Sequence, residues 1–228
     1  MRKWLPMTLV AGLFVALAMP ALAQKSKDTF RMGLTAPIKG LSYYFDPKPD
    51  TVMHQAAIYD GLVAYDEKNF KFEPLLAKSW KRINPTTIEF ELRDDVKWHD
   101  GQAFDADDVA YTFAWLTDKK TRLRFKRFWN WIGKVEKLGP HKVRISAKKP
   151  TAFDLARYAY YTAMVPQHVH GAYKGKEKVK FGQKPVGTGP YKGIQVDKNK
   201  GIIMERNDAY KHGGKVKRTG NIKRLIFL

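Results

Sequence analysis

The sequence of 228 residues contains no cysteine. Disulfide bonds, thiolate zinc sites, iron–sulfur clusters, cysteine nucleophiles and a lipid-modified N-terminal cysteine are therefore excluded. The sequence also lacks the GxSxG, HExxH, Walker and GxGxxG patterns that mark common hydrolases, zinc peptidases and nucleotide-binding enzymes. From these absences we predict that the protein has no enzyme activity, no catalytic residues, no bound metal and no cofactor.

Acidic residues are scarce in the second half of the chain. Residues 119–228 hold 28 basic and 6 acidic side chains, a net charge of +22, whereas residues 1–118 hold 14 and 16, a net charge of −2. Such asymmetry raises the question of a polyanionic partner. With 44% hydrophobic residues the chain can still bury a core, which excludes disorder throughout.

Long hydrophobic runs are confined to the N-terminus. Two basic residues at positions 2 and 3 precede the apolar run Met7–Ala18, and Pro20 and the small-residue site Ala21-Leu22-Ala23 follow it. This order is typical of a secretory signal peptide, and the run is too short for a membrane span. We therefore predict a signal peptide over residues 1–23, cleavage before Gln24, and a soluble protein exported to a bacterial periplasm.

The rest of the chain alternates short strands and helices. Strands are predicted where apolar residues alternate or cluster between turn residues, at 29–34, 87–92, 143–145, 201–205 and 222–228. Helices are predicted at 53–62, 104–116 and 152–161. Interspersed elements of this kind indicate an α/β or α+β fold.

Two polar clusters allow a metal-site interpretation and a structural one. Asp105, Asp107 and Asp108 open the helix predicted at 104–116, where a cap and two first-turn carboxylates explain them more simply than metal binding. His168 and His170 form an HxH pair without an acidic neighbour in sequence, which favours an exposed loop over a metal site.

The segment 121–132 (TRLRFKRFWNWI) interleaves four cations with four aromatic rings. Such a pattern suits single-stranded nucleic acid, because cations bind phosphate and rings stack on bases. The alternative is a segment whose rings enter the core while its cations stay solvated. Because the signal peptide predicts export, we favour the second interpretation and predict no nucleic-acid partner.

Seven segments of the chain, taken together, carry a specific pattern. They are 58–62 (IYDGL), 73–80 (EPLLAKSW), 87–92 (TIEFEL), 93–101 (RDDVKWHDG), 104–113 (FDADDVAYTF), 185–191 (PVGTGPY) and 205–210 (ERNDAY). In this order and spacing the chain resembles the family 5 extracellular solute-binding proteins, the oligopeptide, dipeptide and nickel receptors of ABC importers. Within the pattern, Gly187, Gly189 and Pro190 are expected to set a tight crossover rather than to contact a ligand.

The resemblance implies an α/β fold, a lobe of the type II periplasmic-binding-protein kind with a smaller inserted α+β domain. Residues 24–46 would begin the first lobe, 47–184 would form the inserted domain, and 185–228 would return to the first lobe. The resemblance also implies a peptide or other small solute as ligand and an inner-membrane ABC permease as partner. Family members are much longer, so a second lobe is expected to be missing here, and a C-terminal half in trans is a possible further partner.

Candidate ligand contacts come from strand ends and exposed rings. Open α/β folds usually place ligands at strand ends, which selects the loop after the first strand: Thr35, Ala36, Pro37 and Ile38. Trp129, Tyr160 and Tyr161 are further candidates for apolar contact, although all three rings could equally belong to the core.

Two further expectations follow from the charge and from the last strand. The strongly basic half leaves open an alternative function, a cationic exported protein that binds anionic surfaces such as lipopolysaccharide. The strand at 222–228 is apolar, and without later chain we expect it to form an unpaired sheet edge that promotes self-association.

Overall fold

The computed structural model describes residues 28–34, 36, 38, 40–42, 44–45 and 49–228. The predicted signal peptide at 1–23 and its cleavage point before Gln24 lie outside these residues. Within the described part, no helix is long and apolar enough to cross a membrane.

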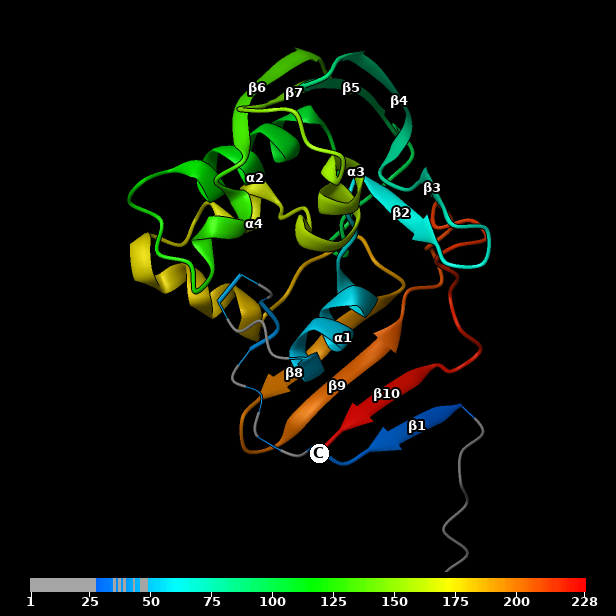
Figure 1. The fold of residues 1–228 in the computed structure, drawn as a ribbon. Helices are drawn as coiled ribbons and strands as arrows, with labels where there is room; N and C mark the ends of the chain where they lie inside the picture. The colour runs from blue at the N-terminus through cyan, green and yellow to red at the C-terminus, as the bar shows by residue number, and fades with distance from the viewer. Residues whose placement is uncertain (1–27, 35, 37, 39, 43, 46–48) are drawn as a thin grey trace, which may run out of the picture.

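The first sheet joins the two ends of the described chain (Figure 1). Its strand order is β1 (Thr29–Met32), β10 (Arg224–Phe227), β9 (Gly201–Arg206) and β8 (Tyr191–Asp197). β1 and β10 run parallel, and the other neighbours are antiparallel. The expectation of an unpaired edge at 222–228 is therefore wrong, because β10 has a hydrogen-bonded strand on each side and Phe227 is buried.

Helix α1 (Pro49–Ile58) lies against one face of this sheet (Figure 1). The register places Met32, Phe227 and Ile202 in one row across β1, β10 and β9, and the ring of His54 meets that of Phe227 at 4.0 Å. The helix starts and ends four residues before the predicted 53–62. Its end at Ile58 leaves Asp60 and Gly61 in the connection to the next strand.

The second sheet is wholly antiparallel, with the order β4 (Ala77–Asn84), β5 (Thr87–Leu92), β7 (Lys142–Ala147) and β6 (Ile132–Gly139). The alternation predicted for 87–92 is confirmed, since Ile88, Phe90 and Leu92 are buried. Between these apolar residues Glu89 turns to Arg144 of β7, with 2.9 Å between Oε1 and Nε. An apolar row on one face and cross-strand ion pairs on the other therefore hold this sheet together.

Helix α2 (Ala106–Thr117) packs against β6 and β7. The predicted cap is confirmed, because the Asp105 carboxylate accepts hydrogen bonds from the backbone N–H groups of Asp107 and Asp108 at 2.8 and 3.3 Å. The Asp108 carboxylate accepts from the backbone N–H of Asp105 at 3.4 Å, which completes a capping box, and from Trp98 Nε1 and the backbone N–H of Gln167, both at 2.8 Å. The carboxylates thus serve helix capping and packing, as the structural interpretation predicted.

Short elements complete the chain: the hairpin β2 (Val63–Asp66) and β3 (Lys71–Pro74), the single turns η1 (Lys126–Trp129), α3 (Asp154–Ala156), η2 (Arg157–Tyr161) and α4 (Gln167–His170), and the 3₁₀ stretch η3 (Gly175–Gln183). The helix predicted at 152–161 is present from Asp154, as the one-turn α3 that continues directly into the π-helical turn η2. Buried residues of both sheets and of the helices form one connected core. The mixed α/β fold predicted from the sequence is confirmed.

Candidate functional site

The loop after β1 lies where two strands end at the same edge. β1 and β10 are parallel, and the backbone N–H of Leu34 donates to the carbonyl of Leu228 at 2.6 Å. Beside this contact is a cavity of about 230 Å³, lined by Leu34, Ala36, Ile38, Leu228 and the turn 197–202. The carboxyl edge of parallel strands is the usual ligand position in open α/β sheets.

The four predicted loop residues differ in their surroundings. Ala36 is exposed and Ile38 is buried, and both line the cavity. Thr35 and Pro37 lie outside the described residues. Ligand contact by all four stays a prediction.

The chain that follows this loop leads to the ring of Trp129. Tyr44 contacts Trp129 and Trp115, with ring centroids 5.2 and 5.0 Å apart. Trp129 is buried, and its Nε1–H donates to the carbonyl of Tyr161 at 2.9 Å. Trp129 therefore connects η1 to the end of η2, and the ring of Tyr44 packs against Trp129.

An exposed pair of stacked rings lies next to this buried tryptophan. Phe128 and Tyr161 have centroids 5.6 Å apart and planes inclined by 8°, while 40% of Phe128 and 39% of Tyr161 remain exposed. The structure thus brings two of the predicted residues together, Trp129 as support and Tyr161 as surface. Tyr160 is also exposed, but its ring contacts Tyr65 of β2, at 6.0 Å.

The favoured interpretation of the segment 121–132 needs correction. It expected the rings to enter the core, which Trp129 does and Trp131 does in part. Phe125 and Phe128, however, are exposed and meet edge to face at 5.8 Å. The alternation of cations and rings misled the prediction because η1 is one 3₁₀ turn, and so short a turn buries one ring and leaves its neighbours outside.

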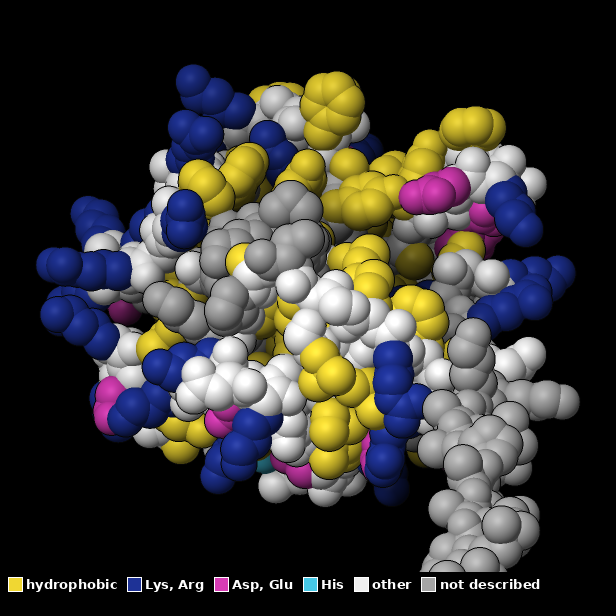
Figure 2. Space-filling model, turned by 90° about the horizontal axis from the view of Figure 1, so that it is seen from below, with side chains coloured by type: hydrophobic (Ala, Val, Ile, Leu, Met, Phe, Trp, Pro, Cys, Tyr) yellow, Lys and Arg dark blue, Asp and Glu magenta, His cyan; other side chains and the backbone are white. Residues whose placement is uncertain are grey.

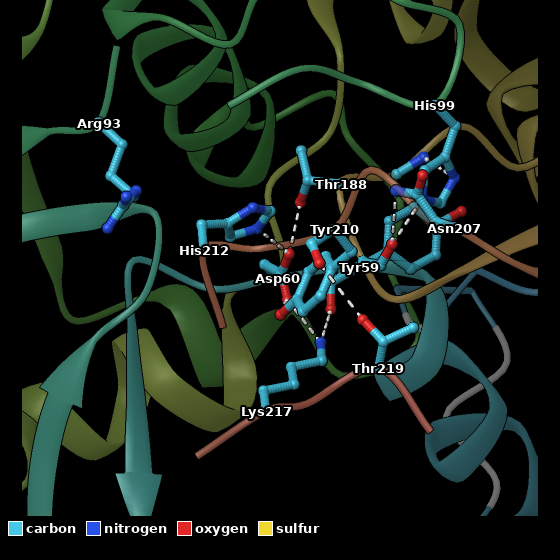
Figure 3. Close-up of polar contacts among 12 residues, drawn as sticks. Tyr59, Asp60, Arg93, His99, Thr188, Asn207, Tyr210, His212, Lys217 and Thr219 are labelled. Carbon is cyan, nitrogen blue, oxygen red and sulfur yellow. Dashed lines mark hydrogen bonds and ion pairs between the residues drawn. The ribbon is translucent and has the colours of Figure 1, made fainter. Parts of the chain in front are cut away.

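A buried carboxylate joins three distant segments close to the first sheet (Figure 3). Asp60, in the connection from α1 to β2, is fully buried. Its Oδ2 accepts hydrogen bonds from Thr188 Oγ1 at 2.8 Å and His212 Nε2 at 2.9 Å, and its Oδ1 accepts one from Lys217 Nζ at 2.6 Å. Lys217 Nζ also donates to the carbonyl of Tyr59 at 2.6 Å.

The neighbours of Asp60 keep its carboxyl group ionised. Burial alone would raise the pKa of this carboxyl, but the Lys217 ammonium and the hydrogen bond from His212 together hold the pKa well below its usual range. The group is therefore ionised at neutral pH and acts as a structural anchor. This contact set was not predicted, because Asp60 lies in the IYDGL motif whereas His212 and Lys217 lie in a segment without any recognised pattern.

His99 fixes the glycine crossover beside this anchor (Figure 3). The backbone N–H of Gly187 donates to its Nδ1 at 3.2 Å, and its Nε2–H donates to the carbonyl of Gly189 at 3.0 Å. Burial lowers the pKa of His99 to about 4, so the ring is neutral, as these two bonds require. A side chain at Gly187 would place its Cβ 2.0 Å from the carbonyl oxygen of Ile58. The fold-setting role predicted for these glycines is confirmed.

The exposed loop predicted for the HxH pair is wrong, because both histidines lie in the one-turn helix α4 and their environments differ. His168 Nε2 lies 2.7 Å from Asp100 Oδ2, whereas His170 is buried and its Nδ1 accepts a hydrogen bond from the Tyr111 hydroxyl at 2.7 Å. Among the residues that the structure describes, no group of three or more histidine, aspartate or glutamate side chains is placed to hold a metal ion.

The basic side chains do not form one continuous patch on the face seen from below. Figure 2 shows Lys and Arg spread around the outline of that face, with hydrophobic side chains across its middle.

Comparison with known proteins gives one consistent result. The family model for bacterial extracellular solute-binding proteins, family 5 Middle, matches residues 71–228. The chain is 30% identical over 166 residues to the nickel-binding periplasmic protein of Escherichia coli, covering 71% of this chain and 31% of that protein. It is 29% identical over 161 residues to the oligopeptide-binding protein AppA of Bacillus subtilis, covering 68% and 29%.

Comparison with solved structures gives proteins of the same kind. The crystal structure of NikZ from Campylobacter jejuni in complex with Ni(L-His) superposes with a TM-score of 0.75 at 29% identity, covering 88% of this chain and 39% of that one. The solved structures that match this fold are type II periplasmic binding proteins, so the predicted fold type is confirmed. The chain spans about a third of the length of the curated relatives it matches.

Proposed function

The chain belongs to the bacterial extracellular solute-binding proteins of family 5, and from this membership we propose that it serves as the solute-binding component of an ABC importer. Members of the family are transport components without enzyme activity. We propose a periplasmic location, a peptide or another small solute as ligand, and an inner-membrane ABC permease as partner. Relatives named as oligopeptide-binding and nickel-binding proteins support this range of ligands. The alternative of adhesion to anionic surfaces finds no support among them.

The domain division remains part of this proposal. Residues 24–46 and 185–228 would form one lobe and 47–184 an inserted domain, with strands of the first sheet in the first two ranges and strands of the second sheet in the third. Because the chain spans about a third of its relatives' length, we also propose that a C-terminal half, in cis or in trans, completes the ligand site and increases its affinity.

The observation that carries the proposal is the support of exposed rings by a buried one. Trp129 is fixed by its hydrogen bond to the Tyr161 carbonyl, and Phe128 and Tyr161 stack on the surface directly beside it. Rigid rings at a surface offer apolar contact to a ligand at little entropic cost. We propose that this ring pair, Tyr160 and the loop 35–38 contribute ligand contacts.

Thermal unfolding in the presence of solutes tests the proposed function. A ligand that binds only the folded chain stabilises it by RT ln(1 + [L]/Kd), so Tm rises with the logarithm of the ligand concentration once this exceeds Kd. We expect at least one member of a panel of short peptides and nickel–histidine to raise Tm at millimolar concentration.

Two ring variants give this test its control. Tyr161→Ala should reduce the ligand-induced rise in Tm, whereas Phe70→Ala, which removes an 80% exposed ring from the β2–β3 hairpin, should leave it unchanged. The absence of any rise across the panel, or equal loss in both variants, would contradict the proposal.

A further inference from the structure

Eight arginines fall into two groups by their partners, whereas Arg31, Arg122 and Arg218 of the described residues belong to neither group. Five of them form ion pairs with carboxylates at 2.5–2.8 Å: Arg82, Arg93, Arg144, Arg206 and Arg224. Three others, Arg124, Arg127 and Arg157, lie over aromatic rings instead, and within the described chain no carboxylate pairs with them. The second group is confined to the region between α2 and α4 that contains the stacked rings.

The ring contacts of Arg124, Arg127 and Arg157 do not use the N–H donors of their guanidinium groups. The guanidinium carbon of Arg124 lies 5.7 Å from the ring centre of Phe125, that of Arg127 lies 5.8 Å from Phe128, and that of Arg157 lies 5.1 Å from Trp131. A cation over a ring face is oriented by the ring but donates no conventional hydrogen bond to it. The planar guanidinium therefore keeps its forked N–H donors for a carboxylate, the group whose geometry matches it best.

Acceptors are lacking throughout this surface. No acidic residue occurs from Lys119 to Val135. The Lys126 ammonium is already engaged, since it donates to the backbone carbonyls of Asp118 and Thr121 at the end of α2. The indole N–H of Trp131 is buried and has no acceptor among the described residues. The segment that carries Arg124, Arg127 and Phe128 therefore supplies no carboxylate of its own to these arginines.

Resting on the proposed function, we propose that the solute of this protein carries a carboxylate beside a flat, apolar group. The carboxylate would be bound by Arg127 and Arg124, and the flat group would lie against Phe128 and Tyr161. A peptide with an aromatic residue next to an acidic residue or to the free C-terminus has this chemistry. A neutral or cationic solute would leave the forked donors of these two exposed arginines to water.

Matched peptides separate the two parts of this requirement. The probes are Ala-Phe-Asp with a free C-terminus, its analogue without carboxylates Ala-Phe-Asn amide, and Ala-Ala-Asp, titrated into the full chain by calorimetry at about 0.15 M salt. We expect Ala-Phe-Asp to bind about tenfold more tightly than the amide, the effect of one charge-assisted hydrogen bond. Ala-Ala-Asp should also bind more weakly than Ala-Phe-Asp, because it lacks the ring.

Substitutions assign the preference to the arginines. The double variant Arg124→Gln/Arg127→Gln should bind the acidic peptide and its amide equally. Arg127→Lys, which keeps the charge but not the planar fork, should lose much of the preference. Arg31→Gln, at an exposed position on β1, is the matched control and should keep it.

The outcomes distinguish this inference from the function on which it rests. Binding of the amide as tightly as the acid, or a preference that survives in the double variant, overturns the inference and leaves the proposed function intact. Tighter binding of a short oligothymidylate than of any peptide also overturns it, in favour of the nucleic-acid interpretation of the segment 121–132. Failure of every probe and of the wider solute panel overturns both.

Discussion

The ammonium group of Lys217 lies 2.6 Å from Oδ1 of Asp60, although the two residues are 157 positions apart in the chain. The same ammonium also donates to the carbonyl of Tyr59, and His212 Nε2 donates to the other carboxylate oxygen of Asp60. These hydrogen bonds attach the segment that contains His212 and Lys217, which has no regular secondary structure, to the connection between α1 and β2. Because this connection joins the helix on the first sheet to the β2–β3 hairpin, the ion pair fixes how the two parts meet.

Substitution Asp60→Asn should destabilise the protein by about 2–4 kcal/mol. The change leaves the largely buried Lys217 ammonium without a compensating charge, and breaking a buried pair at one partner is costly. The free energy of unfolding, measured with urea, checks this value. Glu177→Gln is the control, because its pair with Lys180 is exposed on both sides, and a change within about 0.5 kcal/mol is expected. Equal effects of the two substitutions would show that the buried anchor is unimportant.

Substitution Gly187→Ala should cost about 2–4 kcal/mol of stability. Its Cβ would lie 2.0 Å from the carbonyl oxygen of Ile58, and backbone must move to relieve the clash. Gly139→Ala, at the end of β6, meets nothing within 4 Å and should change stability by less than about 1 kcal/mol. Thermal unfolding of both variants measures the difference, and a Gly187→Ala protein as stable as Gly139→Ala would contradict this packing.

Stability should fall as the pH is lowered from 6.5 towards 4. Burial lowers the pKa of His99 to about 4 and that of His170 to about 3, so in this window the unfolded chain binds protons that the folded chain does not. Each of these histidines contributes a slope of up to about 1.4 kcal/mol per pH unit. The stability they provide is complete above pH 6.5 and is lost on acidification.

Urea unfolding at several pH values checks this slope. His99→Asn removes one titrating group, so its stability should change with pH less steeply than that of the unsubstituted chain, whatever its absolute stability. An unchanged slope in this variant would show that His99 is protonated in the folded protein, against the two hydrogen bonds it forms to the glycine crossover.

Elements with a strong local pattern could be predicted from the sequence. The strand at 87–92 alternates apolar and acidic residues, and α2 carries its own capping box. By contrast, β4 is mostly exposed, β6 is half exposed, and both lack strict apolar alternation. It is pairing with β5 and β7 that makes them strands. The 222–228 strand was recognised, but its neighbour β1 lies at the other end of the described chain.

The candidate site could be predicted only in part, because its contacts join residues that are distant in the sequence. Trp129 and Tyr161 were identified as rings able to line a ligand surface, but their hydrogen bond and the stacking of Phe128 depend on the turns η1 and η2 meeting in space. The Asp60 anchor joins residues more than 100 positions apart through single polar contacts. Contacts of that kind leave no periodic trace in a sequence.

Solute binding at the supported ring pair is tested most directly on the indole N–H signal of Trp129. In proton–nitrogen correlation NMR this signal, assigned by its loss in Trp129→Phe, reports on the hydrogen bond to the Tyr161 carbonyl beneath the exposed rings. Titration with the best ligand of the solute panel should move it along a saturable curve, while the indole signal of Trp80 on β4 stays in place. A Trp129 signal that does not move with any solute, or that moves only together with that of Trp80, would contradict the account.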